Sequence, residues 1–155
     1  MSRLSASFEG NTVPGRLLDW KLWLALAAGP AVWFALALIV HPGFRPGWPL
    51  AKPWVFITLC LIYPVLEEIV FRGLLQDWLA QRFKRRALYG LSAANVVTSL
   101  IFAALHFIYH PPLYAALVLF PSLVFGYFRE RHATLATPIA LHIWYNAGYF
   151  FIFGL

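Results

Sequence analysis

Five apolar segments follow one another along the chain, separated by short connections. They cover residues 17–40, 54–75, 87–109, 113–128 and 135–155. None of them alternates strictly between apolar and polar positions, as the strand of a membrane barrel would. A helix satisfies its backbone hydrogen bonds internally, and about 20 mostly apolar residues cross the hydrocarbon layer. The pattern therefore predicts an all-α, polytopic transmembrane helical bundle with about five membrane segments.

Composition supports a membrane protein. The chain is 61% hydrophobic and only 12% charged, against roughly 25% charged residues in soluble domains. We expect one membrane domain over residues 1–155, with a polar N-terminal tail at 1–16. The first apolar segment is too long for the core of a signal peptide and is expected to be a retained helix. The single cysteine, Cys60, is expected to be a small buried apolar residue.

The basic residues predict the orientation in the membrane. If the segments alternate in direction, one side has only Arg45 and Lys52, and the other has Arg3, Arg16, Lys21, Arg82, Lys84, Arg85, Arg86, Arg129 and Arg131. The richer side is expected to be cytoplasmic, which puts the N-terminus inside and the C-terminus outside. Because these residues flank helices, the net charge of +6 indicates lipid headgroups and not nucleic acid as the partner.

The second segment contains charged residues where hydrocarbon is expected. Glu67, Glu68 and Arg72 lie in an otherwise apolar run. Such residues cost about 2.5–3.5 kcal/mol each on insertion and tend to face an interior cavity. Glu68 and Arg72, four positions apart, share a helix face and would form an ion pair, whereas Glu67 is rotated by about 100°. We expect Glu68 to be structural and Glu67 to be available for proton transfer; the alternative is snorkelling at a helix end.

Two further segments contain polar residues at helical spacing. Phe102 and His106 lie one turn apart, as do His142 and Asn146. Taken alone, His106 would equally well be a core residue with its hydrogen bonds satisfied. The alternative for Asn146 is a hydrogen bond that holds two helices together. His110 is expected to be interfacial. A carboxylate, two imidazoles and an amide gathered around one cavity would suit water-mediated acyl transfer.

Three ordered motifs carry a family resemblance. Glu67-Glu68-x-x-x-Arg72, Phe102-x-x-x-His106 and His142-x-x-x-Asn146 resemble the signatures of the CAAX-protease and bacteriocin-processing family of intramembrane proteases, and Phe125-Gly126 also looks similar. The resemblance covers residues 63–147, the expected catalytic core, and the chain looks more similar to short bacterial members than to the much longer eukaryotic ones. It implies a glutamic-type peptidase of the bacterial inner membrane that acts on a membrane-associated protein or peptide, with C-terminal sorting or CAAX-like signals as candidate substrates.

The resemblance also implies roles for the motif residues. Glu67 and His106 would activate water, and His142 and Asn146 would form the oxyanion site. Glu68 and Arg72 would support the motif helix. We expect no metal; a zinc-dependent variant of the same protease is the alternative.

Two alternatives to an enzyme are a noncatalytic immunity or scaffold protein and a small transporter or proton relay, which would use the same buried residues.

One geometric difficulty concerns the third segment. If it begins at residue 87, His106 approaches the opposite surface from Glu67 and His142, because a helix rises about 1.5 Å per residue. We therefore expect this segment to begin later or to be tilted, with residues 87–91 at the interface.

Overall fold

A computed structural model describes residues 16–40, 47–83, 87–88 and 90–154 of the chain. Helices account for most of these residues. The elements are a 3₁₀ turn at η1 (Arg16–Leu18), α1 (Trp20–Val40), α2 (Trp48–Ala51), α3 (Pro53–Ile57), the π-helical η2 (Thr58–Ile62), α4 (Tyr63–Glu68), the π-helical η3 (Ile69–Gln76), α5 (Asp77–Arg82), β1 (Ala87–Leu88), β2 (Leu91–Ser92), α6 (Ala93–His106), α7 (Pro112–Leu117), α8 (Leu119–His132) and α9 (Ala136–Phe153).

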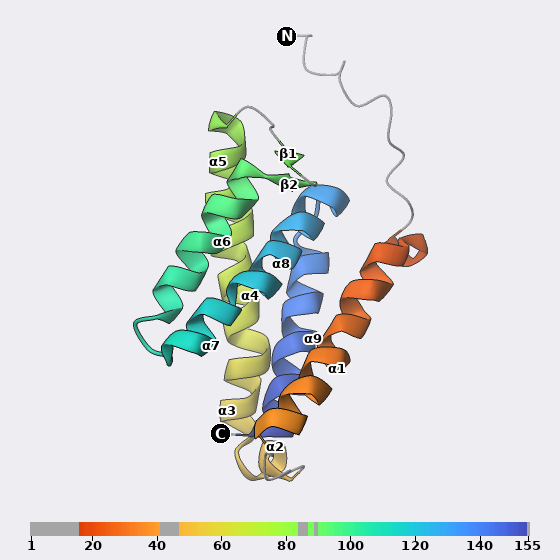
Figure 1. Cartoon of the computed structure of the whole chain (residues 1–155), viewed down its shortest axis with the longest axis vertical. Helices are drawn as coiled ribbons and strands as arrows, with labels where there is room; N and C mark the ends of the chain where they lie inside the picture. Colours follow the sequence, from red (N-terminus) through yellow and green to blue (C-terminus); the bar gives the residue numbers. More distant parts are fainter. Residues whose placement is uncertain (1–15, 41–46, 84–86, 89, 155) are drawn as a thin grey trace.

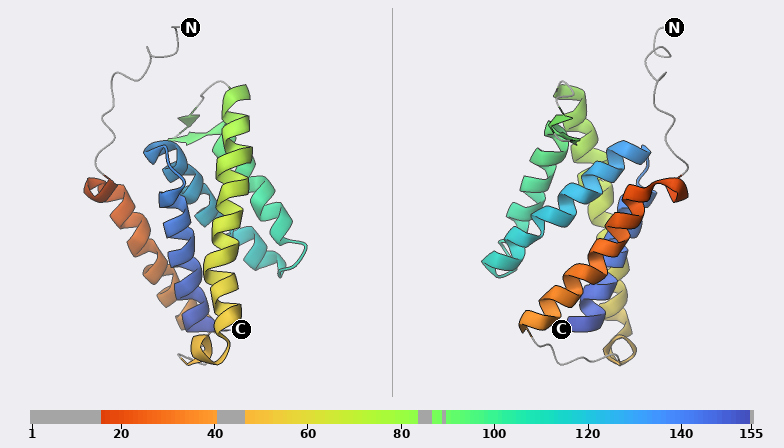
Figure 2. Two further views of the ribbon diagram at one scale, coloured as in Figure 1. Left: turned by 180° about the vertical axis from the view of Figure 1, so that it is seen from behind. Right: turned by 45° about the vertical axis from the view of Figure 1, so that its right-hand side comes forward.

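Helix α9 lies at the centre of the bundle. Elements α3 to α5 run on as one long helix beside it, and α1 crosses its other side (Figure 1). Helix α9 packs against α1, α4, η2 and α8, while α6 packs against α8 and η3. The same arrangement is visible from behind and after a 45° turn (Figure 2). A residue on the inner face of α9 therefore meets side chains from several other helices.

The predicted membrane-helical fold is confirmed. Among the described residues, three helices are long and apolar enough to cross a membrane: Trp20–Ile39, Pro53–Arg82 and Pro112–His132. The third predicted segment corresponds to the shorter apolar helix Ala93–His106, and the fifth corresponds to α9, which has 18 residues. Successive segments run in alternating directions through the bundle (Figure 1).

The second segment is longer than predicted. We expected a connection from residue 76, but the helix continues to Arg82. Tertiary partners stabilise this extension: Leu79 is buried, and the Gln76 amide donates to the Gly126 carbonyl at 3.0 Å. The expectation of a connection from residue 76 was wrong because Gln76 is buried against α8, although Gln81 and Arg82 at the end of the helix are exposed.

The third segment begins later than residue 87, as the sequence analysis required. Strands β1 and β2 form a short antiparallel hairpin, and Ser92 caps α6 by accepting from the Asn95 backbone N–H. Helix α6 has 14 residues, so it is about 21 Å long and shorter than the roughly 30 Å hydrocarbon layer. His106, at its end, therefore lies at an intermediate depth and not at the opposite surface.

A polar cluster fixes the N-terminal end of α1 to α8 and α9. The Asp19 carboxylate, which is buried, accepts from Arg131 and lies 2.9 Å from His132 Nε2. His132 Nδ1 is 2.9 Å from the Thr137 hydroxyl. The Arg131 guanidinium, which donates to Asp19, holds the pKa of that carboxyl well below its usual value. These contacts set the relative height of α1, α8 and α9.

The start of α1 and the ends of α5 and α8 lie at the same end of the bundle (Figure 1). This is the end that the sequence analysis assigned to the cytoplasm, and it includes Lys21, Arg82, Arg129 and Arg131. The opposite end includes Lys52. The polar tail at residues 1–15 and the expected contributions of Arg45, Lys84, Arg85 and Arg86 lie outside the described residues.

Candidate active site

The two adjacent carboxylates of the first motif have different environments. Glu68 and Arg72 have no exposed side-chain surface, and Glu68 Oε2 lies 3.2 Å from Arg72 Nε. The Glu67 side chain, rotated away on the same helix, is 32% exposed. Glu68 therefore has a cationic neighbour inside the protein, whereas Glu67 remains accessible to small molecules.

His142 joins α9 to both carboxylates. Its Nδ1 lies 2.8 Å from Glu68 Oε1, and its Nε2 lies 3.6 Å from Glu67 Oε2. A carboxylate only accepts hydrogen bonds, so Nδ1 donates to Glu68. The imidazole of His142 therefore lies between the two carboxylates of the motif helix.

Aromatic rings enclose this charged group. Phe125 stacks on His142 with ring centroids 4.7 Å apart, and Phe102 lies 6.1 Å from His142. The Arg72 guanidinium lies over both phenylalanine rings, at 4.9 Å from Phe102 and 5.5 Å from Phe125. Ring faces attract cations, so these contacts stabilise the Arg72 guanidinium in its buried position. From the sequence, Phe125 was part of the similar-looking pair Phe125-Gly126 and had no predicted role.

His106 approaches the site through Phe102. Its ring lies 4.6 Å from that of Phe102, and its Nδ1 is 2.8 Å from the Phe102 carbonyl. A carbonyl accepts, so Nδ1 holds the hydrogen and Nε2 of the neutral ring holds a lone pair. Within the described part of the chain, no hydrogen bond or ion pair joins His106 to Glu67. His106 is thus near the charged group but separated from His142 by a phenyl ring.

His110 continues the series of rings away from the site. It stacks on His106 at 5.5 Å and lies 4.8 Å from Tyr114. The His110 side chain is exposed. It therefore connects the vicinity of His106 to the surface of the bundle.

Asn146 projects toward η2. Its Nδ2 donates to the Leu59 carbonyl at 3.0 Å, a bond that ties α9 to the segment preceding the motif helix. The amide has two hydrogens, so one remains for a second acceptor. The structure thus brings Glu67, Glu68, Arg72 and His142 into direct contact, with Asn146 one helical turn along α9 from His142.

The comparison with protein families bears on this arrangement. A family model described as type II CAAX prenyl endopeptidase Rce1-like matches residues 47–148. The chain belongs to this family. No curated protein and no solved structure shows a significant match to the chain.

The Rce1-like match agrees with the resemblance in the three motifs, and it makes the protein an integral membrane member of a CAAX-type intramembrane protease family. It includes every element that contributes to the charged group. Helix α1 precedes the matched region, so the contacts between α1 and α9 lie outside what the family match covers.

A metal site does not form from the residues of this centre as they are arranged. Over the described ranges, no group of three or more His, Cys, Asp and Glu side chains is placed to hold a metal ion. Both Glu68 oxygens already have side-chain neighbours, His142 at Oε1 and Arg72 at Oε2.

A row of buried polar residues begins at the motif, and its continuation beyond Arg72 was not predicted from the sequence. Gln76 lies four residues after Arg72, which lies four after Glu68, and all three are almost fully buried. The Arg72 guanidinium donates to the Ser122 carbonyl at 2.9 Å and hydroxyl at 2.7 Å, and the Gln76 amide donates to Glu130 at 2.7 Å. The repeated spacing of four was the available signal, and it extends the polar face of the motif helix toward α5.

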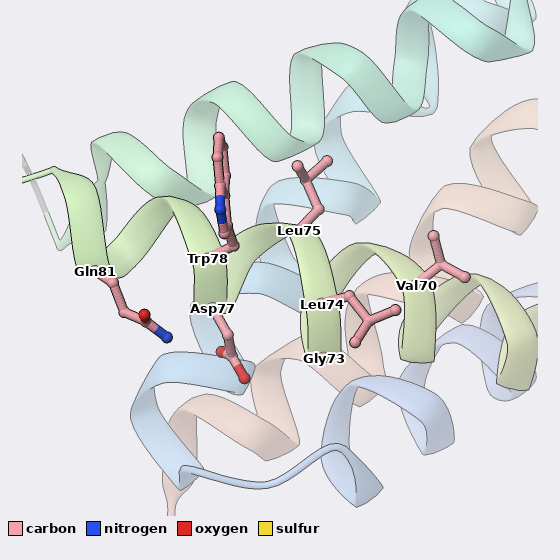
Figure 3. A pocket seen from close by; sticks show the side chains of 7 residues that line it. All are labelled: Val70, Gly73, Leu74, Leu75, Asp77, Trp78 and Gln81. Atoms are coloured by element: carbon pink, nitrogen blue, oxygen red, sulfur yellow. The ribbon is translucent and has the colours of Figure 1, made fainter.

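An open groove lies farther along the same helix (Figure 3). Its lining residues are Val70, Gly73, Leu74, Leu75, Asp77, Trp78 and Gln81. Neither Glu67 nor His142 lines it. The groove is therefore distinct from the charged group and lies nearer to α5.

Proposed function

We propose that this protein is an intramembrane endopeptidase that hydrolyses a peptide bond near the membrane in a membrane-associated protein or peptide. One observation carries the proposal: a partly accessible carboxylate, Glu67, lies 3.6 Å from an imidazole that is itself held by the Glu68–Arg72 ion pair. This arrangement supplies a base beside a balanced set of charges. Family membership supports peptide hydrolysis as the reaction.

In the proposed reaction, Glu67 accepts a proton from water while the water oxygen attacks the carbonyl carbon of the substrate. The lone pair of His106 Nε2 assists in orienting that water. The tetrahedral intermediate carries an oxyanion, which the Nε2–H of a protonated His142 and the remaining amide hydrogen of Asn146 stabilise. Glu67 then returns its proton to the leaving amine as the C–N bond breaks, which balances the proton transfers.

Glu68 and Arg72 have supporting roles in this proposal. Glu68 accepts from His142 Nδ1 and so fixes which face and which nitrogen of the ring reach the substrate. Arg72 compensates the Glu68 charge and donates to Ser122 on α8, while Phe102 closes the other side. No residue in this scheme requires a metal ion.

The proposed setting is the bacterial inner membrane, with the N-terminus in the cytoplasm and the C-terminus outside. The clustering of Lys21, Arg82, Arg129 and Arg131 at one end of the bundle supports this orientation. Residues 1–155 would form one membrane domain, with the catalytic core at 63–147. Proteins with C-terminal sorting or CAAX-like signals are the proposed substrates.

The test is cleavage of a membrane-anchored reporter peptide in proteoliposomes. Glu67→Gln should lower kcat by about 10²–10⁴-fold, because the base is lost, while leaving the unfolding transition in place. Asp77→Asn is the matched control: it makes a similar carboxylate-to-amide change on the same long helix, in an ion pair with Arg129. Full cleavage by Glu67→Gln, or equal losses in the two variants, would refute the proposed role of Glu67.

A further inference from the structure

Two prolines within membrane helices leave carbonyl groups without their usual donors. A proline has no N–H, so the carbonyl four residues earlier loses its helical partner. Pro30 lies inside α1 and removes the donor for the Leu26 carbonyl. In the structure, Trp144 Nε1 of α9 donates to that carbonyl at 3.0 Å.

Pro64 produces a similar gap in the helix before the motif. In η2 the hydrogen-bond register shifts by one residue, and the Tyr63 N–H donates to the Thr58 carbonyl. In that register the Leu59 carbonyl would pair with residue 64, which is proline and has no hydrogen to donate. Asn146 Nδ2 of α9 donates to the Leu59 carbonyl at 3.0 Å.

Both replacement donors come from α9, two residues apart. Successive residues on a helix are rotated by about 100°, so Trp144 and Asn146 point to widely separated sides of α9. One binds α1 and the other binds η2. An unpaired carbonyl in a membrane interior is costly, so each bond resists rotation of α9 about its own axis. His142 lies on the same helix, so its side chain points at Glu67 only while α9 keeps this rotational setting.

We propose that Pro30 and Pro64 are positioning residues: the carbonyls they leave free are docking points for Trp144 and Asn146, which together aim His142 at Glu67. This inference rests on the proposed function for its catalytic consequence, although the docking itself does not. It gives Asn146 a second role, because one amide hydrogen holds α9 in place while the other remains for the oxyanion. It also gives α1 a function in the site, although α1 lies outside the family match.

The decisive experiment is a double-mutant cycle at Pro64 and Asn146. Asn146→Ala leaves the Leu59 carbonyl unpaired, but Pro64→Ala supplies a backbone N–H that takes the place of the lost amide. The loss of kcat caused by Asn146→Ala should therefore be about tenfold smaller in the Pro64→Ala background than in the parent protein, with KM changing less than about twofold. Any loss that remains in the Pro64→Ala background measures oxyanion donation.

Unfolding is measured on the same four proteins, without substrate. Asn146→Ala should lower the midpoint of denaturation in the parent and have a smaller effect in the Pro64→Ala background. Pro112→Ala, at the exposed first residue of α7, is the control proline and should not change the effect of Asn146→Ala. If Asn146→Ala shifts the midpoint equally in the parent protein and in the Pro64→Ala background, the proposed docking of Asn146 on the Leu59 carbonyl is overturned. If the effects of the two substitutions on stability are coupled but their effects on kcat are not, the proposed positioning of His142 is overturned.

A second pair of substitutions tests the contact between α1 and α9. Trp144→Phe removes the indole donor, and Pro30→Ala restores a backbone donor for Leu26. The expected effect is smaller than at Asn146, because the Tyr145 hydroxyl also donates to α1, at the Ala25 carbonyl. If the parent protein does not cleave the reporter, the proposed function fails, but the stability cycles still decide whether the carbonyls dock α9.

Discussion

The buried ion pair of the motif helix makes a quantitative prediction about stability. Arg72→Met keeps a long side chain but removes the guanidinium that lies 3.2 Å from Glu68 and donates to Ser122. Neither ionic side chain has exposed surface, so water cannot compensate the charge that is left. Removing one partner of a buried pair costs about 3–5 kcal/mol. We expect Arg72→Met to lower the free energy of unfolding by about this amount.

The companion variants separate charge from packing. Glu68→Gln combined with Arg72→Met removes both charges, so the double variant should regain most of the lost stability, with a coupling energy of at least about 2 kcal/mol. Arg129→Met is the matched control. Its ion pair with Asp77 has side chains 20% and 39% exposed, and the expected cost is about 1 kcal/mol or less.

The assay is unfolding in mixed micelles by increasing denaturing detergent, followed by the fluorescence of the chain's tryptophans. Free energies are compared at one detergent composition so that the micelle is constant. The reasoning is refuted if Arg72→Met is no more destabilising than Arg129→Met, or if the double variant is no more stable than Arg72→Met alone.

Three further predictions concern packing, pH and metal. At Gly148 a Cβ would overlap the Trp33 ring, so Gly148→Ala should separate α1 from α9 and cost about 1–3 kcal/mol in unfolding measurements, whereas Gly47→Ala, with open space around it, should be neutral. Asp19 has a lowered pKa through its bond to Arg131, so its contribution to stability is present above about pH 4 and lost as the pH falls through the lower folded-state pKa. Asp19→Asn should therefore be destabilised relative to the parent at neutral pH, with a gap in unfolding free energy that narrows below about pH 4; a gap that is constant with pH would contradict this. Reporter cleavage should survive dialysis against a zinc chelator, and a loss that added zinc reverses would contradict the metal-free mechanism.

Local spacing along the chain was enough to identify the polar faces. Glu68 and Arg72 are four residues apart, and an α-helix brings such residues together whatever surrounds them. The same rule relates His142 to Asn146. The hydrophobic segments were equally readable, because a membrane imposes a length and a composition on every helix that crosses it.

Only the tertiary structure decided which of these faces meet. That His142 contacts both Glu67 and Glu68 depends on the packing of α9 against α4, and no spacing between such distant residues encodes it. The late start of α6, which puts His106 at an intermediate depth, follows from a hairpin and the Ser92 cap.

The role of Asn146 at Leu59 also required the structure. The sequence contains Pro64, which predicts an unpaired carbonyl nearby, but the π-helical register determines that the carbonyl is that of Leu59. The neighbour that supplies the missing hydrogen then depends on which helix packs there. Helix formation is governed by neighbours in sequence, whereas the satisfaction of buried polar groups is governed by neighbours in space; the sequence therefore determined the membrane helices and their polar faces, and the fold determined the site.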